Sequence, residues 1–144
     1  MHSTIHAVTQ RIIDRSRAAR QDYLGRMNEL KARSPHRSSL SCGNLAHGFA
    51  ACNQGDKNTL KLMNKANVAM VSAYNDMLSA HQPYATFPDV IREAAHGMGS
   101  VAQFAGGTPA MCDGVTQGQP GMELGLFSRD TIAMSTAIAL SHNM

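Results

Sequence analysis

Two short apolar runs separated by a helix-like segment constrain the fold of this chain more than any other feature. Residues 68–74 (VAMVSAY) and 100–105 (SVAQFA) lack the polar alternation of a strand with one face in water. Such runs are typical of strands in a parallel sheet that is covered on both faces. Pro88 suits the first turn of an intervening helix, which Gly97 ends. The order strand, helix, strand predicts a right-handed βαβ unit.

A long amphipathic helix is predicted over residues 4–32, ahead of this unit. Apolar residues recur there at spacings of three, four or seven, and arginines fill the other faces. Ser34-Pro35 ends the helix, because a residue before proline resists helical geometry. The apolar positions are Ile5, Val8, Ile12, Ala19, Tyr23, Met27 and Leu30.

Three further helices are expected. One lies within residues 39–52, where Gly43 and Gly48 interrupt an apolar segment. Asp56 is expected to cap another over Lys57–Asn64. Ser128 is expected to cap the last helix, from Arg129 to about Ser141, with an acid in its first turn.

The fold class that follows is α/β. We expect a helical N-terminal extension over residues 1–64, followed by a βαβα portion of a parallel sheet over residues 65–144. No linker-like stretch divides the chain, so residues 1–144 read as part of one incomplete domain. Ligands bind at the carboxyl ends of the strands in such sheets. Loops 75–84 and 106–121 leave those ends, so we expect both to face one crevice.

Charge and composition narrow the class of protein. The net charge is +3 with a pI of about 9.0, and no RNA-binding motif or zinc-finger spacing accompanies the basic residues. We therefore expect no nucleic-acid partner; a solvated face or a contact to an acidic partner explains the charge equally well. No apolar run is long enough for a membrane, and the start does not resemble a secretory signal, so a cytoplasmic protein is expected. The basic residues near the N-terminus are Arg11, Arg15, Arg17, Arg20, Arg26, Lys31, Arg33 and Arg37.

The two loops hold the side chains with chemical potential. The first reads AYNDMLSAHQPY and has two interpretations: a loop that satisfies its own backbone, or one that sits over a substrate. Of the seven histidines, only His81 falls in a predicted crevice loop. The second loop is glycine-rich and contains Cys112-Asp113, where a carboxylate suits Mg²⁺ and a thiolate suits iron–sulfur or zinc. Cys42 and Cys52 are expected to be small buried hydrophobic residues. For Cys112 two roles remain possible, a buried hydrophobic residue or a metal ligand.

Four segments resemble the phosphogluconate dehydratase branch of the dihydroxy-acid dehydratase family. The two most specific stretches are YNDMLSAHQPY (74–84) and MCDGVTQGQPGMEL, which lies within the segment 106–130. The resemblance runs along nearly the whole chain, and the second loop distinguishes this branch from the branched-chain amino-acid enzymes. The segments are HRSSLSCGNLAHGFAAC (36–52), YNDMLSAHQPY (74–84), GGTPAMCDGVTQGQPGMELGLFSRD (106–130) and IAMSTAIALSHNM (132–144).

The resemblance implies a lyase of the Entner–Doudoroff pathway that dehydrates 6-phospho-D-gluconate to 2-dehydro-3-deoxy-6-phospho-D-gluconate. Family enzymes use an iron–sulfur cluster, here expected to be 4Fe-4S, as a Lewis acid on the leaving hydroxyl, and Mg²⁺ is a possible further ion. A metal is useful because hydroxide is a poor leaving group. The resemblance further implies a homodimer for the full-length protein.

Site residues carry over by their place in the motifs. Asp113 matches a Mg²⁺-binding aspartate, so the resemblance makes it a metal and catalytic residue, with Cys112 beside it as a second metal candidate. His81 is carried over as a catalytic residue of the first loop. The remaining matched positions are assigned to the substrate or its surroundings: Asn75, Gln82, Gly114, Thr116 and Gln117.

Two departures from the family pattern bear on these roles. Ala80 stands where the dihydroxy-acid dehydratases place a cluster cysteine. The other cluster cysteines and the proposed catalytic serine base belong to segments expected beyond residue 144, so the chain reads as an N-terminal fragment that is inactive alone. Two alternatives remain: a non-catalytic sugar-phosphate or metal-binding domain, and a helical module that binds a partner or drives oligomerisation.

Overall fold

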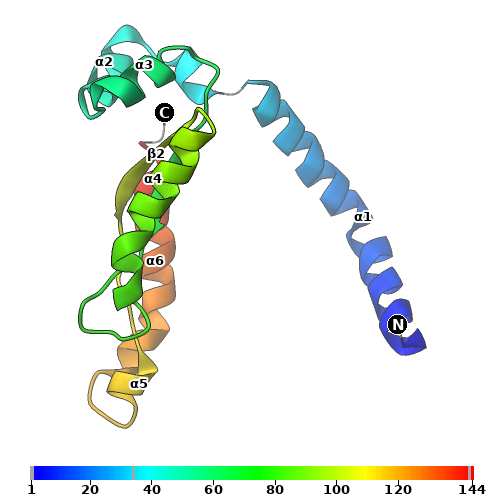
Figure 1. Cartoon of the computed structure of the whole chain (residues 1–144). Coiled ribbons are helices and arrows are strands. Elements are labelled where there is room, and N and C mark those ends of the chain that lie inside the picture. The colour runs from blue at the N-terminus through cyan, green and yellow to red at the C-terminus, as the bar shows by residue number, and fades with distance from the viewer. Residues whose placement is uncertain (1, 34, 143) are drawn as a thin grey trace.

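The computed structural model describes residues 2–33, 35–142 and 144. Four helical segments precede the first strand, and a helical connection joins it to the second (Figure 1). The elements, with 3-10 helices marked η, are α1 (Ser3–Ala32), η1 (His36–Ser39), α2 (Cys42–Ala50), α3 (Gln54–Leu60), β1 (Asn67–Ser72), η2 (Gln82–Thr86), α4 (Phe87–Gly97), β2 (Val101–Gly107), α5 (Asp113–Thr116), η3 (Met122–Leu124) and α6 (Gly125–Leu140).

The sheet confirms the predicted parallel pair. β1 and β2 pair in parallel from Asn67 opposite Val101 to Met70 opposite Phe104. The register then skips Ala105, so that Val71 lies opposite Gly106. Gly106 has a φ of 142°, which a residue with a side chain rarely adopts, so this glycine permits the irregularity. The predicted α/β class, with α4 joining the two strands, is therefore confirmed.

The helices α4 and α6 lie on the two faces of this sheet. Met70 and Phe104 line a hollow together with Phe87 and Ile91 of α4. Ala139 of α6 lies on the other face. Its Cβ is 3.9 Å from the position that a Cβ on Gly106 would occupy. Because successive strand residues point to opposite faces, this arrangement puts α4 and α6 in separate layers.

The burial of the strands differs from the expectation. Leu60, Val101 and Ala102 are buried, but Val68 and Phe104 are each 45% exposed. The apolar runs predicted strands covered on both faces. In the described residues the sheet has only two strands, and the two helices do not cover it fully.

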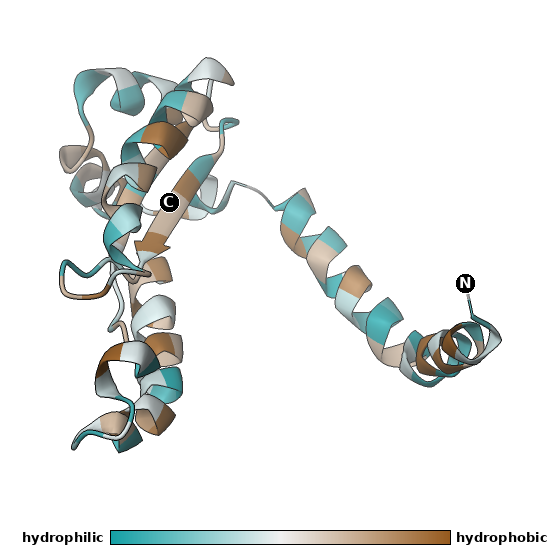
Figure 2. Cartoon of the chain, turned by 60° about the horizontal axis from the view of Figure 1, so that its bottom comes forward, coloured by the Kyte–Doolittle hydropathy of each residue, from teal (hydrophilic) through white to brown (hydrophobic). Residues whose placement is uncertain are grey.

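The helix α1 matches its predicted range and stands apart from the rest of the described chain (Figure 1). None of its described residues is buried. Brown, hydrophobic segments recur along its exposed length in Figure 2. None of the helices in the described ranges combines the length and the apolar character required to cross a membrane.

Two predicted helix starts are wrong. The α3 helix begins at Gln54 and is capped by Asn53, whose Oδ1 accepts a hydrogen bond of 2.9 Å from the Asp56 amide. Asp56 therefore lies inside the first turn and does not cap it. The α6 helix begins at Gly125, and the Ser128 hydroxyl donates to the Gly125 carbonyl from within the helix. Asparagine, aspartate and serine all form such local contacts to the backbone, so the sequence alone does not decide which of them lies at the start of a helix.

Arg37 takes neither of the two roles considered for the N-terminal basic residues, a solvated face or a contact to an acidic partner. Its side chain is fully buried. The guanidinium donates to the carbonyl oxygens of Leu60 at 2.9 Å, of Met144 at 3.4 Å, and of Lys65. Burial lowers the pKa of Arg37 because the charged form loses its water. One side chain thus joins η1 to the segment before β1 and to the residue at position 144.

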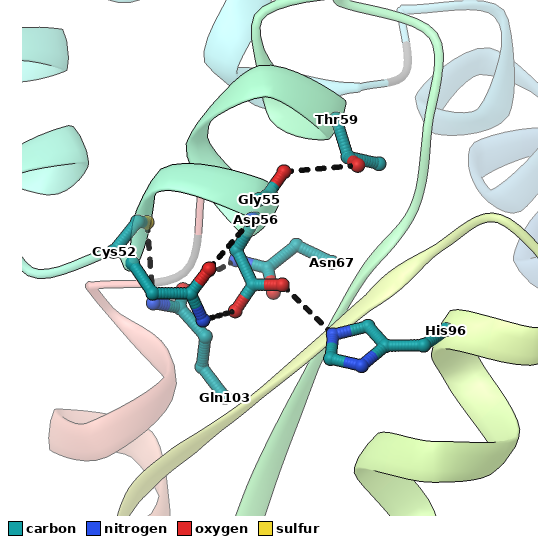
Figure 3. A network of polar contacts seen from close by, with 8 residues as sticks. Cys52, Gly55, Asp56, Thr59, Asn67, His96 and Gln103 are labelled. Carbon is teal, nitrogen blue, oxygen red and sulfur yellow. Dashed lines mark hydrogen bonds and ion pairs between the residues drawn. The ribbon is translucent and has the colours of Figure 1, made fainter.

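A polar network attaches α3 and the end of α2 to the sheet and to α4 (Figure 3). His96 Nε2 lies 2.8 Å from Asp56 Oδ1, which links α4 to α3. Gln103 Nε2 donates to Cys52 Sγ at 3.4 Å, and Asn67 Nδ2 donates to Gln103 Oε1 at 2.9 Å. Asn67 is the first residue of β1, so this network lies at the opposite edge of the sheet from the two candidate loops.

Burial beside this network predicts a low reactivity for the Cys52 thiol, although the hydrogen bond from Gln103 acts in the opposite direction. Burial raises the pKa of Cys52, and the exposed Cys42 has no such cover. Because the thiolate is the reactive form, we expect iodoacetamide at pH 8 to modify Cys42 several-fold faster than Cys52. Mass spectrometry of timed samples measures both rates, and denaturation in urea should make them similar. Equal rates in the native chain would mean that the network opens readily.

Candidate functional site

Both candidate loops leave the same edge of the sheet. β1 ends at Ser72 and β2 ends at Gly107, and the strands are paired neighbours. The Thr108 amide donates to the Ser72 carbonyl at 2.9 Å, so the two segments are still hydrogen-bonded to each other just beyond the strands. In Figure 1 both loops lie at the lower end of the body, and the turn that follows α5 reaches furthest down.

The first loop satisfies much of its own backbone. Asn75 Oδ1 accepts from the Met77 amide at 2.8 Å. The amides of His81 and Gln82 both donate to the Leu78 carbonyl, at 2.9 and 2.8 Å, and Leu78 is buried. The loop is therefore a compact turn, as its first interpretation predicted. This turn leaves Gln82 exposed and Asn75 half-buried.

His81 is held in a defined orientation by this loop. Its Nδ1 lies 2.9 Å from the Ala73 carbonyl oxygen, and its ring packs edge-on against Tyr84 with 5.4 Å between centroids. A carbonyl oxygen can only accept, so Nδ1 carries the proton. In the neutral ring, Nε2 then has a free lone pair. His81 is thus oriented as a base or a hydrogen-bond acceptor needs to be.

The second loop turns into α5 at Cys112. The Cys112 carbonyl accepts from the amides of Val115 at 3.0 Å and Thr116 at 3.3 Å, and the Thr116 hydroxyl lies 3.4 Å from it. The Gln117 amide donates to the Asp113 carbonyl at 2.7 Å. Cys112 and Thr116 are half-buried, while the Gly114 and Gln117 positions are exposed. The expected loop 106–121 therefore contains one helical turn.

Asp113 faces the N-terminus of α6. Its Oδ1 lies 3.6 Å from the position of a Cβ built on Gly125, the first residue of that helix. A carboxylate at a helix N-terminus is stabilised by the helix dipole. Asp113 is exposed and lines an open hollow of about 640 Å³ together with Glu123, Ser128 and Arg129. Sequence reasoning had not assigned Glu123 and Arg129 to the site, although both ionisable residues lie in the same conspicuous motif.

The two loops share an edge of the sheet but do not share that hollow. His81 is absent from the lining of the Asp113 hollow, and its neighbour Tyr84 lines a separate one of about 290 Å³ against α4. The structure therefore brings Asp113 together with the start of α6, and His81 together with Tyr84 and Ala73.

The ligand set in the described residues does not fit an iron–sulfur cluster. Within residues 2–33, 35–142 and 144, no three His, Cys, Asp or Glu side chains gather as metal ligands would. Cys112 and Asp113 are neighbours in sequence, whereas Cys52 belongs to the network at the opposite edge. No step of a reaction is therefore assigned to a cluster held by these residues alone.

Comparison with known proteins covers the whole chain. Residues 65–144 match the family model described as "Dihydroxy-acid/6-phosphogluconate dehydratase N-terminal". The phosphogluconate dehydratase of Pseudomonas aeruginosa is 67% identical over 144 residues, which is 100% of this chain and 24% of the relative. The Escherichia coli K12 protein of the same name is 59% identical over the same 144 residues and the same 24% of its length.

A more distant relative is the dihydroxy-acid dehydratase of Clostridium beijerinckii, 40% identical over 91 residues, or 58% of this chain and 15% of that protein. No solved structure matches the chain. The chain thus spans about a quarter of the length of the curated relatives that it matches over its full length.

Proposed function

Because the chain belongs to the dihydroxy-acid/6-phosphogluconate dehydratase family, we propose that it forms one wall of the active site of a phosphogluconate dehydratase. The enzyme would convert 6-phospho-D-gluconate to 2-dehydro-3-deoxy-6-phospho-D-gluconate. The observation that carries this proposal is the 67% identity across a chain whose two polar loops leave one edge of a parallel sheet. Ligands bind at that edge in folds of this kind.

The reaction needs a base and help for a poor leaving group. The C2–H bond breaks and its electrons form the C2=C3 bond, while the C3–O bond breaks and water leaves. The resulting enol then becomes the 2-oxo product. We assign His81 to the first loop's polar wall, where its free Nε2 could hold or accept a proton. Asn75 and Gln82 would contact the substrate beside it.

Asp113 is proposed as a metal ligand, whose carboxylate would hold a cation such as Mg²⁺ at the second loop. Carboxylates are preferred ligands of Mg²⁺, and Cys112 could add a thiolate. Gly114, Thr116 and Gln117 would contact the carboxylate or phosphate of the substrate. A 4Fe-4S cluster, when bound, would supply a Lewis acid for the departing hydroxyl. The described residues do not form a site for such a cluster, so its cysteine ligands would come from other segments of the protein.

The proposal includes a cytoplasmic site of action and a dimer for the full-length protein. A phosphorylated sugar acid is highly charged and does not cross bilayers unaided, which supports an enzyme in the same compartment as its substrate.

A chimera tests the proposal directly. The matching segment of the Pseudomonas aeruginosa relative is replaced by this chain, and turnover of 6-phospho-D-gluconate is followed by coupling the product to an aldolase and lactate dehydrogenase. At 67% identity the segment should fit its new neighbours, so we expect kcat/KM within about tenfold of the parent enzyme. The isolated 144-residue chain is assayed beside it, with no turnover expected.

The competing substrate class is a 2,3-dihydroxy acid without phosphate, as the Clostridium beijerinckii relative's name indicates. A folded chimera that turned over such an acid and left 6-phospho-D-gluconate unchanged would contradict the proposed substrate. A chimera that is folded and inactive on both would contradict the proposed role of this segment.

A further inference from the structure

The helix α1 carries an apolar stripe that the described chain does not cover. The helix has 30 residues, so it is about 45 Å long. The ends of the stripe are the most open, with Ile5 56% and Leu30 59% exposed, and Ile12 in between is 49% exposed. A long exposed apolar stripe on a helix is typical of a surface that binds another helix.

The spacing of the stripe is the same in both directions along the helix. From Ile5 to Leu30 the steps run three, four, four, three, four, four, three, with Ser16 filling the one polar position. Steps of three, four and four make an eleven-residue period, which keeps a stripe nearly straight along an α-helix. The point of symmetry falls between Arg17 and Ala18.

This symmetry makes the stripe complementary to itself in an antiparallel pair. Ile5 would lie opposite Leu30 of a second copy, and Val8 opposite Met27. Closer to the centre, Ile12 would meet Tyr23. A two-fold interface requires such self-complementarity, whereas a stripe that meets an unrelated surface does not.

The size of the side chains fits the crossing of two straight helices. The central layer consists of Ser16 and Ala19, which are small and allow the two backbones to approach closely. The layers further out hold larger side chains, which fill the widening gap on either side of the crossing point.

The charge distribution favours the antiparallel direction over the parallel one. Arg26, Lys31 and Arg33 lie near the C-terminal end of α1, while residues 2–10 contain no Lys or Arg. A parallel pair would bring the two basic ends together. An antiparallel pair separates them and also opposes the two helix dipoles.

From these observations we propose that α1 is a docking helix for α1 of a second copy of this chain, in an antiparallel pair centred between Arg17 and Ala18. The proposal does not depend on the catalytic role of the two loops. It assigns an interface to the longest of the described helices, none of whose residues is buried.

Sedimentation of the 144-residue chain tests the pairing. The chain should sediment as a species of twice its 15.4 kDa mass. Ile12→Asp places a charge in the stripe and should raise the dissociation constant at least tenfold. Gln21→Asp adds the same side chain on the opposite face of the same helix, so its dissociation constant should stay within twofold of the parent. Circular dichroism at high concentration checks that both variants retain their folded body.

Disulfide formation tests the direction, in a Cys42→Ser background with the parent chain as a blank. A mixture of Val8→Cys and Met27→Cys chains should form a disulfide-linked heterodimer, while each variant alone should not link efficiently. A monomeric parent, or association equally resistant to Ile12→Asp and Gln21→Asp, would overturn the proposal. Efficient linkage of Val8→Cys to itself would indicate a parallel pair and would overturn it as well.

Discussion

Replacing Arg37 with alanine is expected to lower the free energy of unfolding of this chain by about 2–4 kcal/mol. The substitution removes the only described donor group that reaches the carbonyls of Leu60, Lys65 and Met144 together. The Leu60 carbonyl keeps the Met63 amide as a donor at 3.1 Å, whereas the partly buried carbonyls of Lys65 and Met144 lose the guanidinium. A buried carbonyl left without a donor costs about 1–3 kcal/mol, and the lost side chain also leaves a cavity. An effect of this size is a large fraction of the stability of an ordinary domain.

Urea denaturation followed by circular dichroism measures this loss. Arg33→Ala is the matched control, because Arg33 is exposed and its loss should change the free energy of unfolding by no more than about 0.5 kcal/mol. Arg37→Lys should fall between the two, since one ammonium cannot reproduce the planar fork of a guanidinium. If Arg37→Ala unfolded at the same urea concentration as Arg33→Ala, the buried position of this side chain would be wrong.

Replacing Asp113 with alanine in the active chimera is expected to lower kcat/KM for 6-phospho-D-gluconate by at least about 10²-fold. The proposed reason is that the carboxylate holds a metal cation near the reacting groups of the substrate. The helix α5 contains no other acidic residue that could replace it. Because Asp113 is exposed, its loss should change thermal stability little.

Asp130→Ala is the control for this experiment. Asp130 is an exposed carboxylate on α6 that is absent from the lining of the Asp113 hollow, so its loss should leave kcat/KM within about twofold. The thermal midpoint of each variant is recorded to separate lost chemistry from lost structure. Normal turnover by the Asp113→Ala chimera would remove Asp113 from the site.

The regular elements could be predicted because their causes are local. Repeated apolar spacing predicted α1, and Pro88 with Gly97 predicted the extent of α4 to within a residue. The apolar runs predicted both strands and their parallel pairing. Each of these depends on residues a few positions apart, so the sequence carries the signal in one window.

The contacts that were missed depend on distant residues or on competition between neighbours. Arg37 resembles the other arginines in sequence, and only the tertiary structure places three carbonyls around it. Asn53 and Asp56 are both good caps, and their order along the chain does not decide which one caps α3. In the same way, the shared edge of the two loops follows from strand order, but the facing of Asp113 towards α6 depends on how residues 108–124 fold.

The carbonyl at position 144 reaches an arginine 107 residues earlier in the chain. During translation, at about 5–20 residues per second, that arginine emerges many seconds before this acceptor is synthesised. Until then the guanidinium can donate only to the carbonyls of Leu60 and Lys65, which are synthesised 23 and 28 residues after Arg37. The full set of contacts around this side chain should therefore be completed only after residue 144 has left the ribosome.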